Sequence, residues 1–170
     1  MTTTQHRQPI THAPGPVRWA WHVAALVVVI AAGVVLGLRY GSLPDPYPIH
    51  YDLTGTVDGF AAKSPVMVIL PVLIGLGTVV LVAVGDIAQR RSLRARAGRT
   101  PGRYDHLDWT TSRSGRAFPL GPTNVLAAVT LAGASLPAVL GTRAAMGLVW
   151  VGLAGLLALM VVGVRRSRHR

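Results

Sequence analysis

Three side chains that can ligate a metal ion or exchange a proton lie close together in one segment between two apolar runs. His50, Asp52 and Asp58 fall within nine residues, and imidazole with carboxylate oxygens suits zinc and similar ions. His50 and Asp52 are only two residues apart, however, and the segment holds no second histidine. Two other interpretations stay open. One is structural, in which Asp58 pairs with Lys63 or Arg39 and His50 bonds a loop carbonyl; the other is a surface for an extracellular peptide or another subunit.

Other chemistry-bearing residues are sparse. His22 is the one ionisable residue clearly within an apolar run, and Asp86 closes another run. Ionisable side chains at membrane depth are functional candidates, but His22 stands about one turn from Arg18, so we interpret it as an interfacial or packed histidine. The chain has no cysteine, and no nucleotide-binding, metalloprotease or serine-hydrolase motif appears. We therefore predict a protein that is not an enzyme and that carries no metal or cofactor.

Four apolar runs must position these residues. Residues 19–38 carry no formal charge over 20 positions, and at about 1.5 Å per residue they span the roughly 30 Å of a hydrocarbon layer. The other three runs are 66–84, 122–140 and 144–164. Lipid offers the backbone no partners, and no run alternates as a barrel strand does. We predict an all-α integral membrane four-helix bundle, with an ordered extracytoplasmic loop at 39–64 between its first two helices.

Small residues within these runs favour close helix contacts. Gly33 and Gly37 form a G-x-x-x-G pair in the first run, a spacing that lets helix backbones approach. Such a contact would lie within the bundle or between copies, so a homo-oligomer stays open. The three residues after Leu140 allow only a tight turn, so the last two runs are expected to form an antiparallel hairpin.

Basic residues define the expected orientation. The chain has 17 Lys and Arg against 6 acidic residues, for a formal charge of +11. Fourteen of these basic residues lie in the first 18 residues, in 86–121, or after residue 164. The positive-inside rule then places both termini in the cytoplasm and the 39–64 loop outside. We expect the chain in the inner (cytoplasmic) cell membrane, with anionic lipid rather than nucleic acid as the partner of the arginine-rich face.

The predicted organisation has five parts. They are a flexible cytoplasmic tail (1–18), two spans with the outward loop (19–85), a basic cytoplasmic loop (86–121), a transmembrane helical hairpin (122–164) and a basic cytoplasmic tail (165–170).

The outward loop contains a set of residues with a specific order and spacing. They are Leu43, Pro44, Pro48, His50, Tyr51, Asp52, Gly55, Asp58, Phe60 and Lys63. In this pattern the segment resembles the bacterial membrane domain of unknown function 1648, over about residues 20–85. The same domain opens the SdpI-like immunity proteins, which protect a cell from its own toxin and can signal its presence. The resemblance implies an immunity-like or sensing module.

We therefore expect a non-enzymatic multi-pass membrane protein that senses or binds a peptide or protein at its outer face. The alternative is a small transporter or permease-like subunit. That alternative needs a polar path through the bundle, for which the sequence offers Asn124, Thr130, Ser135 and a kink at Pro71. Polar residues facing one shared cavity would favour transport, whereas scattered ones would favour the binding module.

Overall fold

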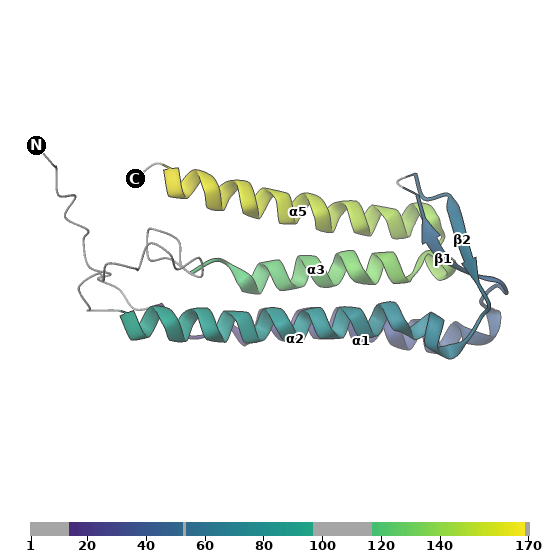
Figure 1. Cartoon of the computed structure of the whole chain (residues 1–170), viewed down its shortest axis with the longest axis horizontal. Helices are drawn as coiled ribbons and strands as arrows, with labels where there is room; N and C mark the ends of the chain where they lie inside the picture. The colour runs from purple at the N-terminus through teal and green to yellow at the C-terminus, as the bar shows by residue number, and fades with distance from the viewer. Residues whose placement is uncertain (1–13, 53, 97–116, 169–170) are drawn as a thin grey trace, which may run out of the picture.

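The computed structural model describes residues 14–52, 54–96 and 117–168, and most of these are helical. Long helices lie side by side along one axis, with a small sheet at one end (Figure 1). In chain order the elements are α1 (Trp19–Arg39), a 3-10 turn η1 (Tyr40–Ser42), β1 (Tyr47–Tyr51), β2 (Val57–Ala61), α2 (Pro65–Arg96), α3 (Leu120–Ser135), α4 (Pro137–Leu140) and α5 (Thr142–Arg168).

Three helices in the described chain are long and apolar enough to cross a membrane. They cover Trp19–Ser42, Pro65–Ala95 and Thr142–Gly163, with mean hydropathies of 2.4, 2.8 and 2.4. Large apolar side chains point outward from them, including Leu38, Leu81 and Val151, which are 81%, 72% and 64% exposed. Soluble monomers rarely show so much apolar surface. These features are those of a membrane protein.

The third apolar run is divided between two helices. Helix α3 has 16 residues and ends at Ser135, and α4 begins at Pro137. Proline has no backbone N–H, and its ring clashes with the carbonyl four residues earlier, so a regular helix stops there. Residues 122–140 thus contain no single helix of spanning length.

Helix α3 occupies the middle of the assembly. It packs against α1 and α2 on one side and against α5 on the other, while α5 otherwise packs mainly on α4 (Figure 1). In a regular four-helix bundle each helix would contact two neighbours around one common core. Here the described helices stack in layers, and the buried core lies between α1, α2 and α3.

Glycines permit two of these close approaches. A Cβ atom on Gly33 would lie 3.0 Å from Cγ1 of Val72, so this glycine packs α1 against α2, whereas nothing lies within 4 Å of a Cβ on Gly37. A Cβ on Gly152 of α5 would lie 2.9 Å from the Leu126 carbonyl of α3. Small residues of this kind bring helices together in lipid.

Two predicted parts of the chain lie largely outside the described residues. Residues 1–13 of the predicted tail and 97–116 of the predicted basic loop are among them. The first part of that loop is helical, because α2 continues to Arg96. The carbonyls of Gly15 and Pro16 accept hydrogen bonds from the Arg90 guanidinium, at 3.0 and 3.1 Å.

Candidate functional site

The predicted outward loop contains a two-stranded antiparallel sheet, an element that the sequence did not predict. Strands β1 and β2 pair with bulges on either side of His50. Their turn is closed by Asp52, whose Oδ1 accepts hydrogen bonds from the backbone N–H groups of Thr54 and Thr56, both at 2.8 Å. Gly55 takes the positive φ, 88°, that this turn needs. Hydrogen bonds, first that from the Thr54 hydroxyl, lower the pKa of Asp52.

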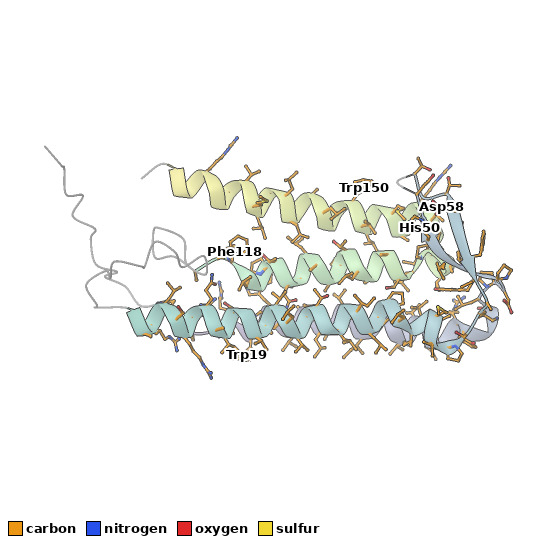
Figure 2. The ribbon with its side chains drawn as sticks, viewed as in Figure 1. Trp19, His50, Asp58, Phe118 and Trp150 are labelled. Carbon is orange, nitrogen blue, oxygen red and sulfur yellow. The ribbon has the colours of Figure 1, made fainter. Side chains whose placement is uncertain are left out.

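His50 and Asp58 face each other across the two strands. Figure 2 shows both side chains at the sheet end of the molecule, where His50 Nδ1 contacts Asp58 Oδ1. Both are exposed. Their approach depends on Gly59, since a Cβ there would lie 2.9 Å from Cβ of His50. Asp52 is engaged in its own turn, and the described residues contain no group of three or more potential metal ligands.

The structural alternative for this segment named the wrong partners. Asp58 pairs with His50 rather than with Lys63 or Arg39. Lys63 instead donates from Nζ to the Leu43 carbonyl at 2.9 Å, and the same ammonium lies 5.6 Å from the Tyr40 ring centroid. The Lys63 backbone N–H also donates to Asp45. Lys63 and the buried Leu43 therefore close the base of the sheet, and the exposed Pro44 lies beside them while Pro48 is buried in β1.

A cleft of about 210 Å³ lies where the sheet meets the helices. Its walls come from β1, from α2 around Pro71, and from the junction of α3 and α4. Pro71 lacks the N–H that would pair with the Met67 carbonyl, and Met67 is also in the wall. Pro71 within α2 and Pro137 at the start of α4 thus border the same cleft.

Two tyrosines of β1 line this mostly apolar cleft. Burial raises the pKa of Tyr47, and burial together with the neighbouring Tyr47 raises the pKa of Tyr51 to about 12. Both phenols therefore stay protonated at physiological pH and can donate a hydrogen bond. In the turn between the strands, Gly55 packs on α5, since a Cβ there would lie 3.2 Å from Cγ of Met146.

A second polar cluster lies inside the helices at the opposite end from the sheet. His22 of α1 contacts Asp86 of α2 (Nε2 to Oδ2, 3.2 Å), and Asn124 of α3 contacts the same ring (Nδ2 to Nδ1, 2.8 Å). Arg90 donates from Nε to Oδ1 of Asp86 at 2.7 Å. His22, Asp86 and Asn124 are 4%, 1% and 0% exposed. Three helices are thus joined by one buried hydrogen-bonded group.

His22 was interpreted from the sequence as an interfacial or packed residue, but its proximity to Asp86 and Asn124 was not predicted. A signal for their proximity was present. His22 and Asn124 lie near the starts of their helices, Asp86 lies 21 residues after the start of α2, and successive spans run in opposite directions. Those positions put all three at one level of the assembly.

The remaining polar residues of the apolar runs do not extend this cluster. Thr78, Thr130 and Ser135 each donate a hydroxyl proton to the carbonyl four residues earlier in their own helix, at 2.7 to 2.9 Å. Such bonds satisfy a hydroxyl locally. The described residues therefore show no continuous polar path along the helices.

Comparison with known families matches the part of the chain that builds the sheet. Residues 26–75 match the family model described as a domain of unknown function, DUF1648. The segment covers most of α1, both strands and the first part of α2. The match covers 50 of the 170 residues, and it supports a relation to the DUF1648 family for this segment. No curated protein sequence and no solved structure matches the chain significantly.

Proposed function

We propose that this protein is a non-enzymatic multi-pass module of the inner (cytoplasmic) membrane, which binds an extracellular peptide at its outer face. The observation that carries the proposal is the cleft between β1, the Pro71 region of α2 and the α3–α4 junction. Immunity to a toxic peptide, or sensing of it, is the use that the family resemblance favours.

The proposed topology has four crossings and both termini in the cytoplasm. In this proposal α3 and α4 together make the crossing that neither makes alone, and the four crossings pack as layers around α3. The amino end of α1, the end of α2 and the end of α5 lie at one end, opposite the sheet (Figure 1). That end carries Arg90, Arg91, Arg94 and Arg165, and the positive-inside rule assigns it to the cytoplasm.

A peptide is the ligand class that best fits the cleft. Apolar groups from α2 offer a place for apolar side chains, and the phenols of Tyr47 and Tyr51 supply hydrogen-bond donors. Strand β1 pairs with β2 on one side only within the described sheet. A peptide in an extended conformation can add to such a strand edge while its side chains enter adjoining pockets.

The transporter alternative has weaker support. Its required polar residues would have to face one shared space, but only Ser135 of the three lines the cleft beside Pro71. Thr130 packs against Gly152 of α5, and Asn124 belongs to the buried cluster. Among the described residues, the buried cluster at the opposite end joins polar groups from three helices. Scattered hydroxyls favour the binding module.

Photo-crosslinking tests peptide binding. A photoreactive amino acid replaces Ile49, which lines the cleft and is 52% exposed, or Val151 as a control on the outward surface of α5. The probe is a biotinylated peptide of alternating apolar and polar residues, added to right-side-out membrane vesicles. We expect crosslinking at position 49 that excess unlabelled peptide abolishes. Equal crosslinking at both positions, or none that competes at position 49, would contradict the proposal.

A further inference from the structure

Asn124 determines which ring nitrogen of a neutral His22 carries the proton. Its Nδ2 group lies 2.8 Å from His22 Nδ1 and 3.1 Å from the Val79 carbonyl. A carbonyl oxygen only accepts hydrogen bonds, so the amide must direct its N–H groups toward Val79, and His22 Nδ1 must accept the other one. The ring proton is therefore on Nε2, from which it donates to Asp86 Oδ2.

Beside this neutral imidazole, the cluster contains two groups of opposite charge. Asp86 accepts from His22 with one oxygen and from Arg90 with the other. An ionised carboxylate accepts both bonds, and the Arg90 guanidinium supplies its counter-charge. The three helices are thus joined by a group with no net charge.

One atom of the cluster has no partner. Oδ1 of Asn124 is buried and makes no hydrogen bond among the described residues. An unsatisfied buried acceptor is costly, and such atoms are rare in folded proteins. It belongs to the same amide whose nitrogen already bonds the ring, so a half-turn of that amide would bring Oδ1 to His22 Nδ1.

We propose that His22, Asp86 and Asn124 form a proton-binding site with two hydrogen-bonded arrangements. In the first, His22 is neutral and the Asn124 amide links the ring to the Val79 carbonyl. In the second, a proton from water occupies the lone pair of Nδ1, and the amide turns so that Oδ1 accepts this new N–H. The proton comes from a hydronium ion, whose O–H bond breaks as the Nδ1–H bond forms, and the cluster gains one positive charge. The bond from Asn124 to the Val79 carbonyl of α2 is lost, and the existing link from Asn124 to His22 of α1 becomes a charge-assisted hydrogen bond.

The surroundings of His22 leave Asp86 as the group that stabilises the added charge. From α2 the ring faces Asp86 and, through it, Arg90. Helix α3 has no titratable residue. On its own helix the ring meets the edge of Trp19 at a centroid distance of 6.0 Å, and Arg18 precedes that residue. Because Asp86 is adjacent, protonation of His22 converts a hydrogen bond from a neutral imidazole to a carboxylate into an ion pair.

Nuclear magnetic resonance of the full chain in lipid nanodiscs tests this site. Histidine nitrogens and asparagine side-chain amides carry ¹⁵N, and His22→Gln and Asn124→Leu identify the two signals. Above the titration we expect an unprotonated Nδ1 and a protonated Nε2 on His22. As pH falls, Nδ1 should gain a proton and the Asn124 amide signals should shift with the same midpoint.

Two comparisons complete the test. Thr130→Val, which removes a hydroxyl bonded within α3, should leave the His22 midpoint unchanged, whereas Asn124→Leu should shift it. The inference is overturned by a proton on Nδ1 at high pH, by a His22 titration that leaves the Asn124 signals unmoved, or by a ring that stays neutral down to the pH at which the protein unfolds.

Discussion

Replacing Asp86 with alanine should destabilise the helices more than any single change at the sheet. One oxygen of the Asp86 carboxylate accepts a hydrogen bond from His22, and the other accepts one from Arg90. Its removal leaves the His22 Nε2–H buried without an acceptor, and it deprives the Arg90 guanidinium of its counter-charge.

The size of the loss in unfolding free energy depends on the hydrogen bonds that His22 and Arg90 keep after the substitution. Loss of one member of a buried ion pair costs about 3–5 kcal/mol in soluble proteins, and an unpaired buried donor costs about 1–3 kcal/mol. Arg90 keeps its bonds to the Gly15 and Pro16 carbonyls and is 16% exposed, which limits its loss. We expect the free energy of unfolding to fall by about 3 kcal/mol.

Reversible unfolding in mixed micelles, followed by circular dichroism, measures this change. Asp58→Ala is the matched control, because it also removes a carboxylate from a histidine, but at a position that is 49% exposed. Exposed pairs contribute about 0–1 kcal/mol, so the control should lose less than about 1 kcal/mol. If Asp86→Ala lost no more than Asp58→Ala, the reasoning about the buried cluster would be refuted.

Three further predictions concern the sheet. Gly59→Ala places a Cβ against His50 and should increase hydrogen exchange in both strands, whereas Gly77→Ala, with nothing within 4 Å, should not. His50→Ala and Asp58→Ala should each make the sheet more sensitive to protease without reducing the helical circular dichroism signal; unchanged protection in both would contradict a role for this pair. Because the pKa of Asp52 in the folded chain is lowered, its turn should be fully formed above the ordinary aspartate pKa of about 4 and lost as pH falls through the lowered value, which amide shifts of Thr54 and Thr56 would report. Turn signals that instead disappeared near the ordinary pKa would be inconsistent with those hydrogen bonds.

Hydropathy alone predicted most of the helical content. The runs 19–38 and 144–164 correspond closely to Trp19–Arg39 and Thr142–Arg168, and α2 begins within one residue of its predicted start. Helix α2 continues 12 residues beyond the predicted end, to Arg96, because a charged segment outside the apolar layer can still be helical. The third run, 122–140, was predicted as one helix, but α3 ends at Ser135 and a separate helix begins at Pro137.

The sheet could not be predicted from local pattern. Strand β1 reads Tyr-Pro-Ile-His-Tyr, in which a proline interrupts the usual strand signal. Its pairing depends on bulges and on the contact between His50 and Gly59. These features form only when both strands meet, so the residues of the family pattern were identifiable while their geometry was not.

The buried cluster shows a different limit. The level of each residue within its helix follows from the run boundaries, but the direction of a side chain depends on how the helix is rotated about its axis. Exposed apolar residues surround α1, so its hydrophobic pattern does not distinguish the buried face that carries His22 and Ala25 from its lipid-facing sides. Packing against α2 and α3 sets that rotation.

Accessibility of single cysteines tests the proposed orientation most directly, because the chain contains no native cysteine. Gly41→Cys and Gly15→Cys introduce thiols at exposed positions with nothing within 4 Å, at opposite ends of α1, and a tag after residue 170 reports the carboxyl end. In intact cells a membrane-impermeant maleimide should label position 41 only, and position 15 and the tag should become accessible together after permeabilisation. Labelling of position 15 in intact cells, the two chain ends on opposite faces, or recovery of the protein in a detergent-free soluble extract would contradict the account.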